Sequence, residues 1–539
     1  MIPFKVSGQP LATTKLMDEL VIRYLHQSPE IAPLVNEFPT DVGFEKKLTS
    51  HELHHSCRKL LVDVLNEQYG SLQKAGESVN ETVSDNIASL LSPSAFTITT
   101  GHQLQLAGGP LFFTYKLLTA VQLADKIRKQ YPSNTIVPIF WLASEDHDIA
   151  EINHFSCAGR NYAWNSNYKG AAGNATCEGM ESLWNELGEQ LSGKPFAADL
   201  IELLRSAYKP TNDLSLATRI FVNRLFGKFG LVVLDANDHR LKAQMKDVFI
   251  DDLINHSTYK KVNETLSTTS LLSDPQVKPR EINLFYLSQE GRNRIAFENN
   301  RYVIVDTEHS FSKDEIIALL NSHPERFSPN VLLRPVYQEK ILPNLAYIGG
   351  PGELAYWLEC KRMFDHYHVA FPLLVLRNNL LQIDLRTQGR MEKLGIDDEQ
   401  LFMDSDVWIR KFTEKNSELT DPFAGKQEKL DLIYNELSAE LTKLDATLEA
   451  PVQAELQKAI KGLAQLKEKW MRAEKRKLET SLDQYRRIRE HVFPQGNFQE
   501  RHESLLDYYA RFGPDILEAW KSILTPLDGK LTILRETNQ

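Results

Sequence analysis

A dense group of ionisable side chains directly follows an apolar run in the first third of the chain. The run covers residues 136–142, and the group that follows at 144–148 reads Ser-Glu-Asp-His-Asp. Carboxylates this close together repel one another unless a ligand, a cation or a basic partner compensates them. The histidine adds a group that titrates near neutral pH and can serve as a general base. The candidates for chemistry in this group are Glu145, Asp146, His147 and Asp148.

A second polar group follows a β-branched run at 96–100. His102 and Gln103 come directly after this run, and a turn then leads into a long apolar-rich segment that predicts a helix. The free amides and the dipole of a helix start favour an anion nearby, and Lys116 would add positive charge there. A turn that only connects strand and helix is the alternative, and both interpretations stay open. The residues of this turn are Gly108, Gly109 and Pro110.

These two groups belong to one predicted β-α-β unit. The apolar runs at 96–100 and 136–142 flank the predicted helix, which is the pattern of such a unit. Parallel crossovers are right-handed, so both strands end at the same edge of the sheet. Ligands of open α/β sheets bind in the crevice outside these strand ends. We therefore predict that Gln103 and His147 lie at one rim of a parallel sheet.

A glycine-rich turn lies between two further predicted strands, at 331–335 and 371–376. Arg334 and Arg377 are expected at the ends of these strands, and therefore at the same edge of the sheet. The turn leaves backbone amides open that can cradle an anion. It is neither a Walker A loop nor a GxGxxG fingerprint. We favour a role in the site over a plain loop for Gly349, Gly350, Gly352, Glu353, Tyr356 and Trp357.

The remaining segments complete a mixed α/β chain. Residues 1–90 are expected to be mainly helical, a third buried strand to lie near 229–235, and alternating segments between 283 and 306 to form a small antiparallel insertion. Within the helical part, residues 51–55 read His-Glu-Leu-His-His, which matches the H-E-x-x-H pattern of zinc sites. The match is short and no downstream ligand stands out. A solvated helix face is therefore expected, and zinc is not.

The composition changes at about residue 425. Leucine and isoleucine repeat at intervals of three and four, stop at Pro451 and resume towards Tyr485. The pattern predicts an antiparallel helical hairpin or coiled coil, whose second arm of about 40 residues (~60 Å) outreaches a first arm of about 24. The excess needs another surface, so we expect a homodimer. The basic stretch at 467–490 could bind RNA or nucleotide phosphates, although a solvated face is favoured.

Composition limits the class of protein. The 539 residues exceed one ordinary core, and 42% hydrophobic with 25% charged residues is typical of soluble globular proteins. The net charge of −10 argues against a chain devoted to nucleic acid. Four scattered cysteines without a CxxC pair fit a reducing compartment, and neither a signal peptide nor a membrane span is recognised. We expect a cytoplasmic protein without membrane or nucleic-acid partners.

Four blocks of the sequence resemble one known family, the BshC cysteine-adding ligases of bacillithiol synthesis. The blocks are TGHQLQLAGGPLFFTYK at 100–116, FWLASEDHDIAEINH at 140–154, LRPVYQEKILPNLAYIGGPGELAYW at 333–357 followed by FPLLVLRN at 371–378, and FPQGNFQER at 493–501. The resemblance spans nearly the whole chain. The family pattern has glutamine at the position of His102, so Gln103 is favoured over His102 as a binding residue.

The resemblance implies an α/β fold, with a Rossmann-like parallel-sheet core and inserted connecting modules similar to class I synthetases, plus an α-helical coiled-coil domain that mediates dimerisation. Two short helices are expected to close the chain. The domains would be a core at 1–390 with N-terminal helices and insertions at about 155–230 and 240–330, a connecting segment at 391–425, the hairpin at 426–492, and C-terminal helices at 493–539 that pack back on the core.

The implied activity joins the carboxyl group of cysteine to the amine of glucosaminyl-malate. ATP or ADP is the expected nucleotide, and magnesium is a candidate cofactor. The family resemblance also implies a nucleotide pocket on the coiled-coil side, separate from the main cleft. The segment that would suit it contains Phe493, Pro494, Gln495, Gly496, Gln499 and Arg501.

Amide formation from a free carboxylate needs an activated carbonyl and a neutral amine, which suggests roles for the candidate residues. Lys116 and the amides at 349–352 could stabilise developing negative charge. Asp146 and Asp148 could hold the cysteine ammonium or a magnesium ion. His147 is the candidate general base.

Arg334 and Arg377 are forked donors suited to the two malate carboxylates. For each single assignment, a structural ion pair at the sheet edge is the alternative. The further expected substrate-binding residues are His102, Gln103, Gly108, Gly109, Glu145, Asn153, Tyr337, Gln338, Tyr347, Gly349, Gly350, Gly352, Glu353, Tyr356 and Trp357.

Two other functions stay open at this point. The first is another ATP-dependent or synthetase-like amide ligase that acts on a different amine. The second is a non-enzymatic scaffold whose coiled coil recruits partners, which should bind neither nucleotide nor cysteine.

Overall fold

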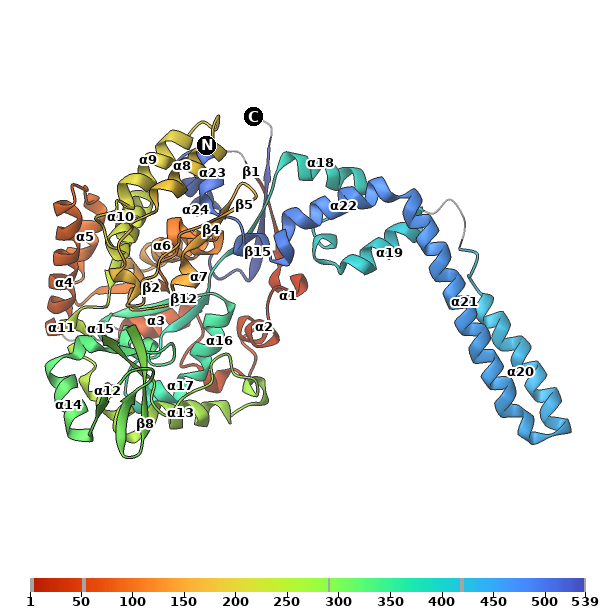
Figure 1. Cartoon of the computed structure of the whole chain (residues 1–539), viewed down its shortest axis with the longest axis horizontal. Coiled ribbons are helices and arrows are strands. Elements are labelled where there is room, and N and C mark those ends of the chain that lie inside the picture. The colour runs from red at the N-terminus through yellow and green to blue at the C-terminus, as the bar shows by residue number, and fades with distance from the viewer. Residues whose placement is uncertain (1–3, 51–54, 289–290, 417–420, 538–539) are drawn as a thin grey trace. The chain divides into compact units, whose positions relative to one another are not determined.

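The computed structural model describes residues 4–50, 55–288, 291–416 and 421–537, and it divides into two compact units (Figure 1). Unit 1 comprises residues 1–382 and 497–537, and unit 2 comprises residues 383–496. Unit 1 is therefore built from two separate stretches of the chain. The first four residues of the H-E-x-x-H match, 51–54, lie outside the described residues.

A five-stranded parallel sheet forms the centre of unit 1. Its order is β13-β12-β2-β3-β6, and all neighbouring strands are parallel. The strands are almost wholly buried, as expected for a parallel sheet with both faces covered. The predicted Rossmann-like parallel sheet is thus confirmed. Its strands are β2 (Ala95–His102), β3 (Thr135–Leu142), β6 (Val232–Asp235), β12 (Asn344–Gly349) and β13 (Leu373–Leu376).

The predicted helix between β2 and β3 is α6 (Leu111–Gln130), and Pro110 stands just before its first residue. Its apolar face packs with α3 and the sheet in one buried cluster that includes Phe44, Ile98 and Leu123. Helices before β2 supply the rest of this N-terminal part. They are α1 (Leu11–Thr14), α2 (Glu19–Leu25), α3 (Asp41–Ser50), α4 (His55–Lys74) and α5 (Glu81–Ser89).

Two insertions interrupt the order of the parallel strands. The first, between β3 and β6, contains α7 (Ile149–Ile152), the hairpin of β4 (His154–Cys157) and β5 (Arg160–Ala163), α8 (Glu181–Gln190), α9 (Ala197–Ala207) and α10 (Leu214–Phe226). The second, between β6 and β12, contains a five-stranded antiparallel sheet of order β10-β9-β8-β7-β11, which confirms the predicted antiparallel insertion.

The second insertion also contains several helices. Its elements are α11 (His239–Ala243), α12 (Lys246–Asn255), α13 (Ser257–Leu266), β7 (Leu284–Ser288), β8 (Gly291–Glu298), β9 (Arg301–Ile304), β10 (Ser310–Phe311), α14 (Lys313–Ser322) and β11 (Phe327–Pro329).

The prediction of a strand at 331–335 is wrong. This stretch is a turn followed by α15 (Arg334–Ile341). The side chain of Asn330 accepts hydrogen bonds from the amides of Leu332 and Leu333, and Pro335 lies in the first turn of the helix. Both features are helix-start signals that outweigh a short apolar run. Two helices follow β12, namely α16 (Pro351–Glu359) and α17 (Lys361–His366).

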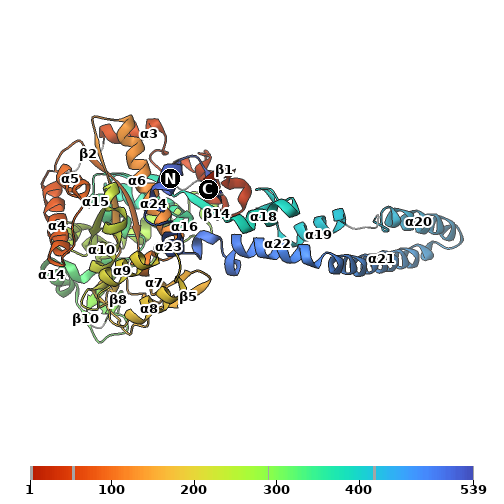
Figure 2. The same cartoon turned by 90° about the horizontal axis from the view of Figure 1, so that it is seen from above.

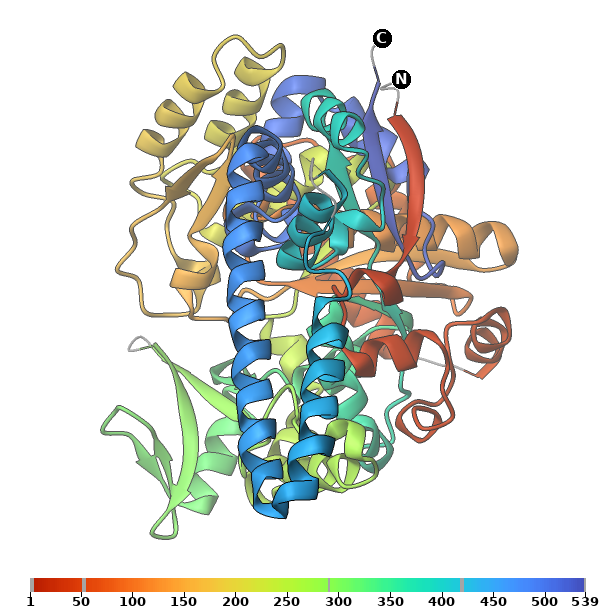
Figure 3. The same cartoon turned by 90° about the vertical axis from the view of Figure 1, so that its right-hand side faces the viewer.

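A small sheet joins the two ends of the described chain. β1 (Phe4–Pro10) pairs antiparallel with β15 (Lys530–Glu536), and β14 (Asn379–Ile383) is the third strand (Figure 3). The prediction that two short helices close the chain is therefore incomplete, because β15 follows α23 (Leu505–Phe512) and α24 (Asp515–Ile523).

Unit 2 contains the predicted helical hairpin. α20 (Lys426–Leu444) and α21 (Glu449–Lys477) run side by side (Figure 2). The long second arm is interrupted at Leu478, and α22 (Glu479–Val492) packs on α18 (Leu385–Leu394). Trp408 of α19 (Ser405–Asn416) stacks on Tyr485 of α22 at 3.9 Å between ring centres. The excess length of the arm is thus covered in part within unit 2.

Candidate active site

A cavity of about 540 Å³, the main cavity of the site, lies where β2, β3 and the second insertion meet. This size suits a small-molecule substrate. The lining residues are Gly101, His102, Gln103, Trp141, Leu142, Ala143, Glu145, Asp146, Ala236, Val277, Lys278, Arg280, Phe285, Arg292, Ser328, Pro329, Asn330, Val331, Arg334, Tyr337, Tyr347, Glu353 and Tyr356.

The ends of β2 and β3 meet as the parallel pairing predicts. His102 lies opposite Leu142 in the register. The side-chain amide of Gln103 donates to Asp146 Oδ2 and to Glu151 Oε2, each at 2.7 Å. Gln103 and the acidic group therefore share one rim of the sheet, because their strands run side by side in the same direction.

Asp146 is held as a carboxylate. Burial raises its pKa, but the charge of Arg292, the hydrogen bond from Gln103 and the amide of His147 outweigh burial, and the net pKa is lowered. Arg292 Nη1 lies 3.7 Å from Asp146 Oδ1. An anionic Asp146 at the cavity wall can receive a cationic group such as an ammonium.

Glu353 forms a second charged centre of the cavity. Its Oε2 accepts from Lys116 Nζ at 2.5 Å and from the Gly350 amide at 2.9 Å, and its Oε1 accepts from the Tyr347 hydroxyl at 2.5 Å. Burial raises the pKa of Glu353, but Lys116 and these hydrogen bonds outweigh burial. The net pKa is therefore lowered, and the group is ionised. Glu353 is the third residue of α16 and also caps that helix.

Lys116 acts from behind the cavity wall. Its ammonium is almost fully buried, donates to the Gly101 carbonyl as well as to Glu353, and does not line the main cavity. Burial lowers its pKa and the charge of Glu353 opposes this. The geometry makes Lys116 a residue that positions Glu353 rather than one that touches a ligand in this cavity.

Arg334 presents a guanidinium held between aromatic rings. Its Cζ lies 5.8 Å from the centre of the Trp141 ring, 5.5 Å from Tyr347 and 5.9 Å from Trp357. It donates to Gln338 Oε1 at 3.0 Å and to the Tyr356 hydroxyl at 3.4 Å. A rigid fork of this kind suits a carboxylate of a ligand.

Gly101 leaves room beside these groups. A Cβ at this position would lie 3.5 Å from the Tyr347 hydroxyl and 3.6 Å from Arg334 Nη1. A Cβ there would therefore be in van der Waals contact with both groups. The glycine allows a ligand to approach the backbone of β2 closely.

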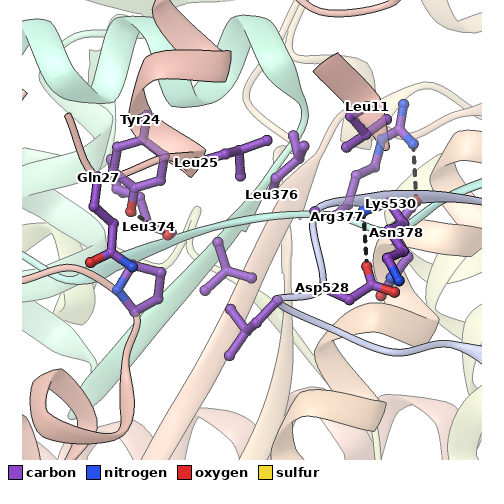
Figure 4. A pocket seen from close by; sticks show the side chains of 14 residues that line it. Leu11, Tyr24, Leu25, Gln27, Leu374, Leu376, Arg377, Asn378, Asp528 and Lys530 are labelled. Carbon is purple, nitrogen blue, oxygen red and sulfur yellow. Dashed lines mark hydrogen bonds between the residues drawn. The ribbon is translucent and has the colours of Figure 1, made fainter. Parts of the chain in front are cut away.

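Arg377 faces other cavities. It directly follows β13, as predicted, but its Nη2 donates to Glu500 Oε1 at 2.8 Å, and both side chains are almost fully buried. It lines a cavity of about 350 Å³ next to the main cavity, together with Gly350, Gly352 and Arg501. Figure 4 shows it in a third cavity, of about 80 Å³. The structure does not bring Arg377 into the main cavity with Arg334.

His102 lines the main cavity in the neutral state. Its ring packs 5.4 Å from that of Phe112 and 5.7 Å from that of Phe113. Burial lowers the pKa of His102 to about 4, and the charge of Lys116 acts in the same direction. A neutral imidazole among aromatic rings contributes to the shape of the cavity rather than to its charge.

Several predicted residues lie outside the lining of the main cavity. His147 is half exposed, Asp148 caps α7, and Asn153 donates to the Trp164 carbonyl. Gln338 lies behind Arg334, and Trp357 stacks on Tyr347 at 4.4 Å. Gly108 and Gly109 form the turn before α6, with φ of 83° and 51°, and Gly349 ends β12.

The segment predicted to bind nucleotide is divided between the two units. Phe493, Pro494, Gln495 and Gly496 belong to unit 2, where Arg489 Cζ lies 4.1 Å from the centre of the Phe493 ring. In unit 1, Gln499 exchanges two hydrogen bonds with the backbone of Gln382. Arg501 lines the 350 Å³ cavity.

The cavity also contains residues that the sequence analysis did not single out. They come from the second insertion and from the aromatic end of β3. The sequence signal that could have indicated them is a pair of basic residues separated by one residue, which occurs at 278–280 and again at 292–294. Within the main cavity these additional residues are Trp141, Lys278, Arg280, Phe285, Arg292 and Asn330.

Comparisons with known proteins match almost the whole chain to one family. A family model described as "Bacillithiol biosynthesis BshC, N-terminal Rossmann-like domain" matches residues 7–378, and one described as "Bacillithiol biosynthesis BshC, C-terminal coiled-coil domain" matches residues 380–536. A protein of Christiangramia forsetii named "Putative cysteine ligase BshC" is 37% identical over 528 residues, which cover 97% of each chain.

Proteins with the same name in other organisms show similar coverage. The one from Flavobacterium psychrophilum is 37% identical over 96% of this chain and 97% of its own length, and the one from Chlorobaculum tepidum is 30% identical over 87% and 86%. A crystal structure titled "putative arginyl t-RNA synthetase", from Campylobacter jejuni, aligns at 11% identity with a TM-score of 0.21, which is too low to support an argument about the fold.

Proposed function

Because this chain belongs to the BshC family, we propose that it is a cysteine ligase of bacillithiol biosynthesis, which joins the carboxyl group of cysteine to the amine of glucosaminyl-malate. The observation that carries the proposal is the main cavity at the end of the parallel sheet. It places an anionic acceptor, Asp146, and a forked cation, Arg334, in one space of substrate size.

Asp146 is suited to bind an amino group. It is ionised and held in place by Gln103, so it offers a fixed negative charge to the ammonium of cysteine. The half-exposed His147 stays the candidate for removing a proton from the attacking amine, since its ring neighbours Asp146 Oδ1 at 3.5 Å.

Arg334 is suited to the carboxyl groups. It lies against the ring of Tyr347, whose hydroxyl donates its proton to Glu353 Oε1. Arg334 keeps its charge because the nearby hydroxyls and Glu353 outweigh burial and raise its pKa. Arg334 can therefore stabilise negative charge on a carboxylate or on a tetrahedral intermediate.

Activation of the cysteine carboxylate requires a nucleotide, and ATP or ADP with magnesium stays our proposal. The 350 Å³ cavity suits phosphate groups, because Gly352 lies at the start of α16 and Arg501 brings positive charge. Nucleotide binding by residues 493–496 of unit 2 stays a separate prediction.

Assembly and location are also proposals. Apolar side chains remain exposed on the hairpin of unit 2, which supports a homodimer formed through it; they are Leu432, Ile433, Leu437 and Leu466. All four cysteines are free thiols, which supports a cytoplasmic location. In the described part of the chain, no helix combines the length and the apolar character needed to cross a membrane.

The test is reconstitution with cysteine, glucosaminyl-malate, ATP and magnesium, with bacillithiol detected by mass spectrometry. We expect product from the wild type and a loss of at least ~100-fold in kcat/KM for Asp146→Asn, which keeps the shape and removes the charge. The control is Asp63→Asn on the exposed face of α4, which should retain full activity. Unchanged turnover by Asp146→Asn would remove Asp146 from the mechanism, and absence of product with the wild type would reject the proposed reaction.

A further inference from the structure

Two of the carboxylates that line the main cavity are compensated by buried lysines. Lys242, fully buried, lies 3.3 Å from Glu145, and Lys116, also buried, lies 2.5 Å from Glu353. The third carboxylate, Asp146, is compensated as described above. Within the described lining, each carboxylate thus already lies beside a basic side chain. Any further cation in the lining therefore needs a negative charge that the lining does not supply.

Two such cations stand at the mouth of this cavity. Lys278 and Arg280 line it from the loop at 273–283, and their side chains are exposed. Across the described residues, neither side chain has an ion-pair or hydrogen-bond partner. Burial lowers the pKa of Arg280, and the charge of Arg294 acts in the same direction, as expected for a cation without a counter-ion. A positively charged cavity wall attracts anions.

The first half of the loop is fixed to α16. The Gln276 amide donates to Glu359 Oε1 at 2.6 Å, and the Gln276 side chain lies 3.6 Å from where a Cβ of Gly352 would stand. Glu359 is almost fully buried. This carboxylate therefore holds the loop against the edge of the main cavity.

The second half is fixed to α12. Asp252, fully buried, accepts from the Asn283 amide at 2.7 Å, and the Asn283 side chain donates to the Arg280 carbonyl at 2.7 Å. Pro275 and Pro279 restrict the backbone on either side of Lys278. The two cations are thus carried by a loop anchored at both ends, which lowers the entropy cost of binding a ligand there.

We infer that Lys278 and Arg280 bind the carboxylates of the amine substrate that lie remote from the reacting amine, and so select for a substrate with an anionic substituent. The inference rests on the proposed function. With Arg334 inside the cavity and Lys278 and Arg280 at its mouth, the diacid end lies on the side of the second insertion. The ammonium-binding Asp146 lies beside Gln103 at the end of the sheet. Nucleotide phosphates share the chemistry of these carboxylates, and the experiment separates the two sources.

The experiment compares Lys278→Gln, Arg280→Gln and the double variant with the wild type. The amines are glucosaminyl-malate and methyl glucosaminide, which lacks the carboxylates. We expect the KM for glucosaminyl-malate to rise about 10-fold for each variant and further for the double variant, because a hydrogen bond to a charged group is lost. The kcat should change less than about 3-fold, since the remote group contributes mainly to binding. The KM for methyl glucosaminide should stay unchanged.

Arg294→Gln is the matched control. It removes one positive charge from the neighbouring strand β8 without changing the lining of the main cavity, and its KM values should equal those of the wild type. Equal KM values for glucosaminyl-malate in wild type and double variant would overturn the inference. So would a selective loss of affinity for ATP or ADP, which would assign these cations to phosphate.

Calorimetry with free malate separates this inference from the proposed reaction. Malate should bind the wild type and Arg294→Gln, and its affinity should fall about 10-fold or more in the double variant whether or not ligation is observed. A wild type that makes no bacillithiol but shows this pattern would reject the reaction and keep the carboxylate site. Equal malate affinity in wild type and double variant would reject the site.

Discussion

At the scale of single residues, the cavity depends on charges that are fixed from behind. Glu353 contacts Lys116, Tyr347 and the start of α16 at once. An ionised carboxylate in this position is stable only while the buried ammonium remains beside it, since an unpaired buried charge is costly. Lys116 therefore contributes to the site by orienting Glu353.

We predict that Lys116→Met lowers the free energy of unfolding of unit 1 by about 3 kcal/mol, because it leaves the partly buried carboxylate of Glu353 without its cation. Adding Glu353→Gln should recover part of this loss, since the remaining side chain is neutral and its single carbonyl oxygen can still accept one of the two hydrogen bonds, from Tyr347 or from Gly350. The double-mutant cycle is measured by urea unfolding. Strictly additive effects of the two changes would show that the pair is not coupled.

At the scale of elements, the loop at 273–283 is held by carboxylates whose burial opposes ionisation. Burial raises the pKa of Glu359 to about 7 and that of Asp252 to about 6. Both values exceed those of an unfolded chain, so folding takes up protons between about pH 4 and 7. The stability that these groups contribute is complete below about pH 4 and is lost as the pH rises through their folded pKa values.

We predict that the midpoint of thermal unfolding of the wild type falls between about pH 4 and 7 more steeply than that of Glu359→Gln. The glutamine imitates the protonated acid and can still accept from the Gln276 amide, so the proton uptake at residue 359 disappears. Scanning calorimetry across this pH range makes the comparison. Parallel curves for the two proteins would contradict a raised pKa at residue 359.

Some of these features can be predicted from the sequence, and others cannot. The contact between Gln103 and Asp146 follows from two apolar runs, one helix and the handedness of crossovers, which are all local signals. Lys278 and Arg280 reach the same cavity only because the second insertion folds over the sheet edge, and no periodicity reports such long-range packing. The apolar run at 331–333 resembles a strand, but Asn330 and Pro335 start a helix there.

At the scale of the whole molecule, the hairpin of unit 2 presents an uncovered apolar face. None of the side chains of α20 is fully buried, and Ile433 and Leu437 are 58% and 42% exposed, one turn apart on the same face. A helix of this kind gains most of its stability from packing against another surface. In the proposed homodimer, a second copy of the hairpin would cover this face.

We predict that Ile433→Glu with Leu437→Glu converts a dimer into a monomer, because each buried glutamate would lose its hydration. Light scattering coupled to size-exclusion chromatography measures the mass. Lys443→Glu, on the same helix, introduces a glutamate at an exposed polar position and should leave the mass unchanged. A monomeric wild type, or a dimeric double variant, would contradict assembly through this face.

The pairing of β1 with β15 has a consequence for how the protein is made. Ser7 and Arg535, which share a hydrogen bond, are 528 residues apart in the chain. At roughly 5–20 residues per second, a ribosome needs on the order of half a minute to two minutes between the two strands. During this interval the early strand waits with open backbone groups, and a chaperone that shields it would determine how much of the newly made chain reaches the native state.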